Sequence, residues 1–468
     1  MRIPDGWRYD KATDKLQQSD DPRDKDKSHC IKLKRNLYGV RQASKNFFEH
    51  ISDGLIKEGF TPSFVDPCLW LRKDCMICLY VDNCIIYANN TSIIDDFISN
   101  MRTQGYLLED EGDVENFLGV NIKATKEGNF EMTQTGLIQD ILNDLGLNLP
   151  NCKYAMHSTP ATAILHADEH EPPFTEKWVY RSLIGKLNFL ALNSRPDIAF
   201  AVHQCARWCS NPRATHGAAV KRIGKYLKTT ETKGIIFRRD GNHPLHAMCD
   251  ADFAGTWCKA NTNTRSSALS RTGFVIMYSG VPIVWHSKLQ TEIALSTCEA
   301  EYIALSQCAR AIIPLRRLIE NISDIYEPID ELQSLTSIEG TTKILSPLGK
   351  SIILEDNAAC IAVAKDNKTK HSPRTRHISI KWHHFRDQIE KGWLTVEKVA
   401  SAQNWSDIFT KPLARVQFEK LRDEMMGWTQ VPPDQYPFPT NPVYKAAFAS
   451  LCNDTDLYGQ RSKRWRHY

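Results

Sequence analysis

Residues 272–305, TGFVIMYSGVPIVWHSKLQTEIALSTCEAEYIAL, contain two apolar runs around Ser279-Gly280 and then a helical pattern with two glutamates. This stretch predicts a β-hairpin that turns at Ser279-Gly280, followed by a long helix. LHAMCDADF at 245–253 predicts a strand before it, and KSIILED at 350–356 predicts another strand after it. Strands with helices between them imply a mixed sheet, so we expect an α/β (α+β) fold in this half of the chain.

Four acidic residues lie in separate short motifs of this region: Asp250 in CDADFAG, Glu301 in STCEAEYIAL, Asp356 in LEDNAACIA and Asp407 in NWSDIFTKPL. Ligand groups cluster at strand ends in such sheets. Mg²⁺ prefers oxygen ligands, and several carboxylates offset the repulsion between two cations. Two ions about 3.5–4 Å apart hold the attacking and leaving oxygens of a phosphodiester displacement. The four acids therefore predict a metal site that cleaves nucleic acid.

Three of the four acids also have a purely structural explanation, which for Asp250 is a turn at the end of its strand. Asp356 precedes a predicted helix and can be an N-cap, and Asp407 lies at another helix start, where an acid favours the helix dipole. Ser296 followed three residues later by Glu299 predicts a capping box. Because capping explains Glu299, we expect Glu301 to be the metal ligand of this pair.

Length and composition predict a globular protein of more than one domain, and the net charge is compatible with a nucleic-acid partner. A chain of 468 residues predicts two or three domains, and 42% hydrophobic residues indicate a globular protein. A net charge of +4 permits a nucleic-acid partner without requiring one. Basic clusters at 368–377 and 461–468 are explained equally well as solvated surface or as phosphate contacts.

The N-terminal sequence, MRIPDGWRYDKATDK, lacks the apolar segment of a signal peptide. A run of about 18 apolar residues is absent, so we expect neither a transmembrane segment nor a membrane partner. The 14 cysteines are scattered, many within apolar runs, as buried reduced thiols are. These features predict an intracellular protein, cytoplasmic or nuclear.

The first half of the chain has a different pattern. Residues 10–29 are charged and predict a loop, and the apolar spacing after Ser44 predicts a helix that Gly59 ends. The runs CLWLRKD, CMICLYV and CIIYA predict strands, with Asp82-Asn83 at the tip of a tight hairpin. Residues 156–240 have a mainly helical pattern, and the Pro-rich segment from 430 to 468 predicts a loosely ordered tail.

The motifs of the second half resemble the ribonuclease H domain of copia-type LTR retrotransposon Pol polyproteins. The similar blocks are CDADFAG, residues 264–305, EDNAACIA, TRHISIKWHHFRD and SDIFTKPL. The resemblance implies that Asp250, Glu301, Asp356 and Asp407 hold two Mg²⁺ ions, with Mn²⁺ as an alternative. Water would then attack the RNA strand of an RNA–DNA hybrid. Asp250 would contact both ions, Glu301 and Asp356 would share one, and Asp407 would complete the other.

The resemblance continues upstream into the reverse transcriptase of the same elements. LKRNLYGVRQASKNFFEHI, DPCLW and LYVDNCIIYA resemble its palm, and RSLIGKLNFLALNSRPDIAFAV resembles the connection to the ribonuclease. The implied organisation is an N-terminal remnant over 1–29, a truncated palm and thumb over 30–155, a connection over 156–240, a ribonuclease H domain over 241–429 and a tail over 430–468.

The palm hairpin departs from the family pattern. Two adjacent aspartates are usual there, whereas this chain has Asp82-Asn83, and MRIPDGW resembles a segment downstream of the palm's first metal-binding aspartate. With Asp82 as the only palm ligand, we expect polymerase activity to be lost. A non-catalytic nucleic-acid-binding relic of a transposable element is the alternative function. A third interpretation is a reverse transcriptase completed by a second chain, in association with other Pol products.

Four basic residues are expected either to approach the hybrid or to form a charged surface loop. They are Lys370, Arg374, Arg376 and His377.

Overall fold

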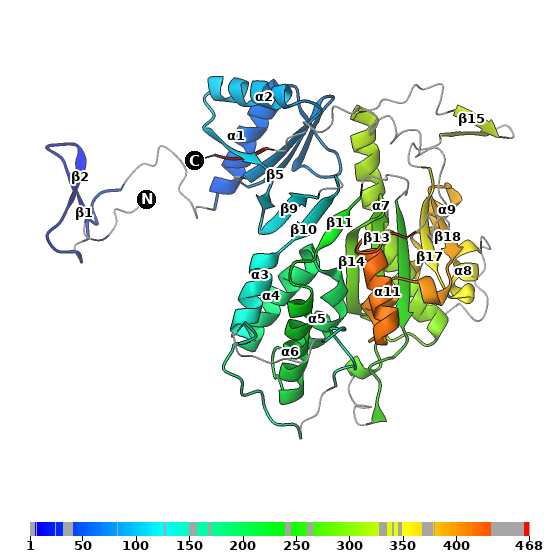
Figure 1. The fold of residues 1–468 in the computed structure, drawn as a ribbon. Helices are drawn as coiled ribbons and strands as arrows, with labels where there is room; N and C mark the ends of the chain where they lie inside the picture. Colours follow the sequence, from blue (N-terminus) through cyan, green and yellow to red (C-terminus); the bar gives the residue numbers. More distant parts are fainter. Residues whose placement is uncertain are drawn as a thin grey trace.

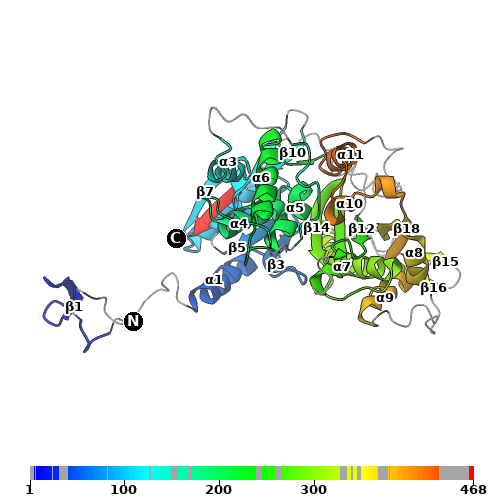
Figure 2. The ribbon, with the colours of Figure 1, turned by 90° about the horizontal axis from the view of Figure 1, so that it is seen from below.

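The computed structural model describes residues 5, 7–23, 25–30, 41–81, 83–125, 128–148, 157–166, 170–238, 245–259, 265–326, 335–338, 341–344, 349–366, 378, 380–431 and 463–467. Figure 1 shows an N-terminal sheet with two helices in blue, a helical group in cyan and green, and a second sheet with its own helices in green to orange. The view from below in Figure 2 shows the helical group beside the second sheet, where α5 (Ala199–Ala206) packs against β14 (Val281–Leu289).

The N-terminal sheet has the strand order β3-β4-β5-β6-β19-β7. Its strands are β3 (Thr61–Pro62), β4 (Leu69–Arg72), β5 (Cys75–Tyr80), β6 (Asn83–Ala88), β7 (Leu108–Asp113) and β19 (Lys463–His467). The helices α1 (Ala43–Lys57) and α2 (Thr91–Thr103) share a hydrophobic core with the sheet. Gly59 follows α1 with a φ of 82°, a conformation that glycine adopts without strain, so it ends the helix as predicted.

The predicted hairpin forms, but its tip is one residue earlier than expected. Tyr80 pairs with Asn83 in the register of β5 and β6, so Asn83 belongs to the strand pairing and the turn precedes it. The same register places buried Ile77 opposite buried Ile86, which fixes the alignment of the strands. Val81 has a φ of 55°, an uncommon conformation for a β-branched residue. Asn83 is therefore a strand residue, and Asp82 lies outside the described residues.

Two segments predicted to lack regular structure form strands. β1 (Trp7–Asp10) and β2 (Lys15–Gln18) make a hairpin within the expected charged loop. The Asp10 side chain accepts hydrogen bonds from the Ala12 N–H and the Thr13 hydroxyl, an Asx turn that the charge pattern concealed. The end of the expected loose tail forms β19, which pairs with both β6 and β7. A strand in this position hydrogen-bonds to backbone groups of both neighbours, which outweighs the polar composition of the segment.

The helical group contains the helices predicted between 156 and 240, together with one helix that precedes them. α3 (Thr135–Asp144) packs against α4 (Tyr180–Asn193) and α6 (Ala214–Thr229), and the short η1 (Pro196–Ile198) leads into α5. A small sheet of order β11-β10-β9-β8 lies beside them. Its strands are β8 (Asn116–Phe117), β9 (Val120–Ala124), β10 (Phe130–Thr133) and β11 (Ile235–Phe237).

The second sheet has the order β14-β13-β12-β17-β18, and it is mixed as predicted. β12 (His246–Asp252), β17 (Ser351–Glu355) and β18 (Leu394–Lys398) are parallel, whereas β13 (Arg271–Tyr278) is antiparallel to both of its neighbours. β13 and β14 form the predicted hairpin, in which Ser279 and Gly280 have φ values of 51° and 74°. Positive φ at both central residues is typical of a type I′ turn.

The elements around this sheet include the long helix that the sequence predicted. They are η3 (Arg265–Ser267), α7 (Thr297–Tyr326), α8 (Ala358–Lys365), η4 (Ile380–His383), α9 (Arg386–Glu390), η5 (Ser401–Gln403), α10 (Asp407–Thr410), α11 (Arg415–Met425) and the hairpin of β15 (Leu335–Ile338) with β16 (Thr341–Ile344). None of the described helices, α7 included, is both long and apolar enough to cross a membrane.

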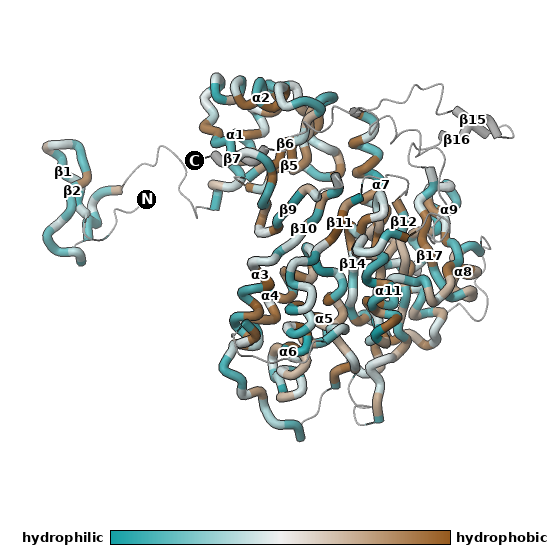
Figure 3. The backbone as a smooth tube through the Cα atoms, viewed as in Figure 1, coloured by the Kyte–Doolittle hydropathy of each residue, from teal (hydrophilic) through white to brown (hydrophobic). Residues whose placement is uncertain are grey.

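The second sheet separates two hydrophobic cores. Alternate residues of β12 face opposite sides, with Cys249 in the core beneath α7 and Met248 in the core that faces α10 and α11. The tube in Figure 3 shows hydrophobic residues concentrated along the sheet strands and on the inner sides of the helices. The core that contains Met248 continues into the helical group, so the second sheet and the helical group bury one common set of side chains.

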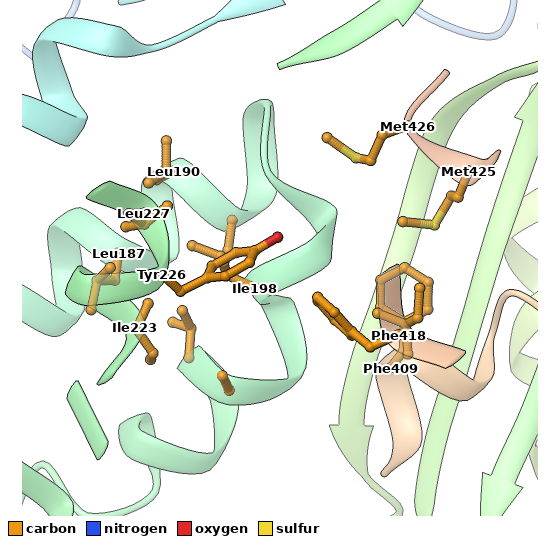
Figure 4. Close-up of a cluster of buried hydrophobic side chains, with 14 of the residues drawn as sticks. Leu187, Leu190, Ile198, Ile223, Tyr226, Leu227, Phe409, Phe418, Met425 and Met426 are labelled. Carbon is orange, nitrogen blue, oxygen red and sulfur yellow. The ribbon is translucent and has the colours of Figure 1, made fainter. Parts of the chain in front are cut away.

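Figure 4 shows this shared core. Tyr226 and Leu187 from the helical group lie opposite Phe418 of α11 and Phe409 of α10. The Tyr226 and Phe418 rings meet edge to face, with centroids 5.9 Å apart. The Trp285 indole N–H donates to the Ala191 carbonyl at 2.7 Å and ties β14 to α4. The helical group therefore packs directly against one face of the second sheet.

A buried ion pair stabilises this junction. Arg195 donates two hydrogen bonds to the Asp197 carboxylate, at 2.9 and 2.8 Å, and both residues are almost completely buried. The Tyr226 hydroxyl also donates to Asp197, and Arg422 of α11 donates to that hydroxyl at 3.3 Å. Burial alone would raise the pKa of Asp197, but the charge and hydrogen bonds of Arg195 lower it. The network thus links α6 to α11 through paired polar groups.

Replacing Asp197 with alanine should lower the free energy of unfolding by about 3–5 kcal/mol, because it leaves the Arg195 guanidinium buried without its counter-charge. Urea unfolding followed by circular dichroism measures this change. Asp144→Ala is the matched control, since Asp144 pairs with Lys186 at 2.8 Å but both side chains are more than a third exposed. The control should cost less than about 1 kcal/mol, and equal losses in the two variants would contradict the role of the buried pair.

Candidate metal centre

Parallel pairing of β12 and β17 brings two of the predicted acids together. Met248 lies opposite Leu354, and the same register continued by two residues places Asp250 opposite Asp356. Asp250 is 3% exposed, whereas Asp356 just beyond β17 is half-buried. The N-cap of α8 is Asn357, whose side chain accepts from the N–H groups of Ala359 and Cys360. Asp356 is therefore not needed as a cap.

Capping separates the two glutamates of α7 as predicted. The Glu299 carboxylate accepts from the Leu295 N–H at 2.7 Å, and the Ser296 hydroxyl accepts from the Glu299 N–H at 3.1 Å. Two residues further along, Glu301 is 7% exposed. Because α7 packs on β12 and β13, Glu301 reaches the strand ends where Asp250 and Asp356 lie.

The fourth acid is placed by a close contact between α10 and β13. A Cβ atom at Gly273 would lie 2.6 Å from Thr410 and 2.8 Å from the Cβ of Phe409, so only glycine lets α10 approach this closely. The Thr410 hydroxyl donates to Asp250 across this contact. Asp407, the first residue of α10, is 3% exposed.

The structure brings three of the four acids into one cluster. Each of Asp250, Glu301 and Asp356 offers a carboxylate oxygen, and these atoms all lie within 4.8 Å of one another. It is the single such group of three or more potential ligands among the described residues. The Oε2 atom of Glu301 is buried without a hydrogen-bond partner, although buried carboxylate oxygens normally have one. An oxygen-rich cluster with an unsatisfied buried oxygen fits a hard divalent cation such as Mg²⁺.

Burial makes these carboxylates costly to ionise without a cation. It raises the pKa of Glu301 to about 11, together with the charge of nearby Glu355. Burial and then the charge of Asp250 raise the pKa of Asp407 to about 7. Burial also raises the pKa of Asp250, despite the opposing charge of Lys411. In the absence of metal, the folded protein therefore retains protons at this site that the unfolded chain releases.

The motif analysis overlooked two residues at the site. Lys411 follows α10 directly, and its Nζ lies 2.8 Å from Asp407 Oδ1 and 3.8 Å from Asp250 Oδ2. Glu355 is fully buried and accepts from the Cys249 thiol at 3.1 Å and from the Asn357 N–H at 3.1 Å. Burial raises the pKa of Glu355 well above its ordinary value. Both residues stood inside quoted motifs, but only the packing reveals what they contact.

Other sequence predictions lie outside the cluster or outside the described residues. Asp252, two residues after Asp250, is half-buried and does not join the three-acid group. Asn83 belongs to the N-terminal sheet. The predicted palm ligand and the four basic candidates for backbone contact lie outside the described residues: Asp82, Lys370, Arg374, Arg376 and His377.

Comparison with known proteins connects both halves of the chain to mobile elements. A family model described as reverse transcriptase (RNA-dependent DNA polymerase) matches residues 17–160. The retrovirus-related Pol polyprotein from transposon RE1 of Arabidopsis thaliana is 28% identical over 431 residues, 90% of this chain and 27% of that protein. The Pol polyprotein from transposon TNT 1-94 of Nicotiana tabacum is 28% identical over 416 residues, 86% of this chain and 28% of that protein. The chain spans about a quarter of the length of these relatives.

A comparison of folds finds a ribonuclease among the solved structures. The structure of LC11-RNase H1, isolated from compost, covers 40% of this chain and 96% of its own chain. It is 12% identical in sequence, with a TM-score of 0.21.

Metal-free protein should lose stability as the pH rises from about 5 to 8. The folded pKa of Asp407, about 7, and that of Glu301, about 11, exceed the unfolded values near 4, so the stabilising proton uptake disappears as the pH passes through the folded pKa. Unfolding in urea with EDTA at several pH values measures this slope. Addition of Mg²⁺ should restore stability, and increasingly so at higher pH.

Glu301→Gln provides the matched variant for this measurement. The folded wild type takes up a proton at Glu301 at pH 8, whereas the neutral amide needs none, so the free energy of unfolding of the metal-free variant should exceed that of the wild type at pH 8 by about 1–3 kcal/mol. It should also respond less to Mg²⁺, because it lacks a ligand. If the free energy of unfolding of the wild type does not change with pH and does not increase on addition of Mg²⁺, a metal centre of this kind is excluded.

Proposed function

Because the chain belongs to the copia-type retrotransposon Pol proteins, we propose that residues 241–429 hydrolyse the RNA strand of an RNA–DNA hybrid in a two-metal ribonuclease H reaction. The observation that carries the proposal is the convergence of oxygen atoms from Asp250, Glu301 and Asp356 within 4.8 Å. The three residues come from two adjacent parallel strands and the helix that covers them. This arrangement forms a compact oxygen site open towards Asp356, the most exposed of the three.

The residues have distinct roles in this proposal. Glu301 and Asp356 would hold one ion together with Asp250, and Asp407 would hold the other. When bound, the divalent ions supply positive charge that stabilises the phosphorane-like transition state and lowers the pKa of the attacking water. The buried side chains of Asp250, Glu301 and Asp407 keep bulk water from one side of the site. The phosphodiester approaches from the side of half-buried Asp356.

The substrate and its setting follow from the same assignment. An RNA–DNA hybrid is distinguished by its A-like shape and by the 2′-hydroxyl groups of one strand. Association with other retrotransposon Pol products is part of the proposal. The free thiol of Cys249, which donates to Glu355, supports a reducing intracellular location, cytoplasmic or nuclear.

We propose that the N-terminal half does not polymerise DNA. Polymerase sites place carboxylates around two metal ions that activate the primer and hold the incoming nucleotide. At the first position of β6 the chain has Asn83, a carboxamide that carries no negative charge. A metal bound at this hairpin would therefore lose one anionic ligand.

Hybrid cleavage tests the ribonuclease assignment. The wild-type chain should degrade the labelled RNA strand of a hybrid when Mg²⁺ is present, and Asp356→Asn should lose at least about 100-fold in rate. The loss follows from weaker metal-dependent charge stabilisation, which is worth several kcal/mol. Denaturing gel electrophoresis of the labelled strand measures the rate.

Glu299→Gln is the control for this assay, since an amide oxygen still accepts the Leu295 N–H and caps α7. It should retain most of the activity, whereas Glu301→Gln should behave like Asp356→Asn. Background cleavage that is equal in the wild type and in Asp356→Asn would favour the non-catalytic nucleic-acid-binding relic.

Primer extension tests the polymerase half. The chain should incorporate no deoxynucleotides on a primed RNA template with Mg²⁺ or Mn²⁺, because the hairpin lacks a second carboxylate. An assay with a radiolabelled primer and an active reverse transcriptase as the positive control measures this. Incorporation by the chain alone would overturn the proposal, and incorporation after addition of a second Pol chain would support shared active sites.

A further inference from the structure

Lys411 places a positive charge inside the candidate metal centre. Its Nζ contacts Asp407 Oδ1 at 2.8 Å and lies 3.8 Å from Asp250 Oδ2. The two carboxylate side chains are each 4% exposed, so little solvent separates them from the ammonium group. A nearby cation stabilises buried carboxylates that approach each other, and here the chain itself provides one.

Three of the four acids form the metal-ligand cluster, whereas the fourth forms an ion pair with Lys411. Asp250, Glu301 and Asp356 have oxygens within 4.8 Å of one another, and Asp407 is not a member of that group. Asp407 is instead ion-paired with Lys411, and Asp250 takes part in both arrangements. A first cation thus finds three converging ligands, whereas a cation between Asp250 and Asp407 meets the ammonium group.

We propose that Lys411 acts as a built-in counter-ion at the second cation position, so that a divalent ion binds between Asp250 and Asp407 only when the ammonium group leaves. The inference rests on the proposed metal site and deepens it, because it makes the two ion positions unequal. The first ion binds to Asp250, Glu301 and Asp356 without displacing the ammonium group. The second ion competes with Lys411 and binds more weakly.

The geometry of the lysine allows this exchange. An ammonium group and a divalent ion repel each other, so a divalent ion beside Asp407 is favoured once the ammonium group has moved away. The Lys411 side chain is 39% exposed, so its head can move into solvent while its flexible stem remains in place. The Thr410 hydroxyl still donates to Asp250, and α10 remains seated against Gly273. Displacement of the ammonium therefore does not require α10 to unfold.

Counting bound Mn²⁺ tests this inference without nucleic acid or cleavage. Electron paramagnetic resonance of free Mn²⁺, titrated into the metal-free full chain, gives the number and affinity of the bound ions. The wild type should bind one ion tightly and a second at least tenfold more weakly. Lys411→Met should bind the second ion at least tenfold more tightly than the wild type, with little change in the first.

Two variants control for charge and for general effects of losing a lysine. Lys411→Arg keeps the positive charge, so its second ion should remain weak. Lys391→Met removes a lysine from an equivalent i,i+4 pair with Asp387, at 2.7 Å, but both side chains there are at least half exposed. This variant should bind Mn²⁺ as the wild type does.

Each outcome of the Mn²⁺ titration supports or overturns the inference about Lys411. An unchanged second affinity in Lys411→Met overturns the inference, and so does equal tight binding of two ions by the wild type. Loss of the first ion in Lys411→Met also overturns it, because Lys411 would then brace the site instead of competing for it. If the second ion tightens as expected but no protein cleaves the hybrid, the inference stands and the proposed ribonuclease function fails.

Discussion

Mutual repulsion among buried carboxyl groups is the constraint on which the site depends. Parallel pairing of β12 with β17 brings Asp250 and Asp356 together, and α7 adds Glu301 from the covering layer. Charged groups this close and this buried need protons, a lysine or metal ions. The metal-free chain uses the first two, through raised pKa values at Glu301 and Asp407 and through the ammonium of Lys411. Stability and metal binding are therefore opposing demands on the same residues.

The helical group contributes to this arrangement although none of its residues belongs to the acid cluster. Its core continues beneath the sheet to Phe409 of α10, so packing far from the metal centre helps to hold Asp407 and Lys411 in place. The paired Arg195 and Asp197 extend the junction to α11 through the Tyr226 hydroxyl. The second sheet, if cut from the helical group, would expose one face of its core.

Many local features followed from short patterns. The Ser279-Gly280 hairpin, the end of α1 at Gly59 and the capping role of Glu299 depend on neighbouring residues, so propensity and spacing predicted them. The turn of the β5–β6 hairpin was predicted one residue too late in the sequence. Alternation of apolar and polar residues identifies the two faces of a strand, but it does not by itself locate the turn. The strand β19 was missed, because its partners β6 and β7 are more than 300 residues away in the chain.

By itself, the sequence determined the mixed fold of the second half, the family resemblance and the four acidic candidates, because each depends on residue types at fixed local spacing. Only the tertiary structure decided that Asp250, Glu301 and Asp356 share one cluster while Asp407 pairs with Lys411. Only the structure revealed buried Glu355 beside Cys249. Distances between side chains on different elements depend on strand register and helix packing, such as the contact at Gly273, which no short motif encodes.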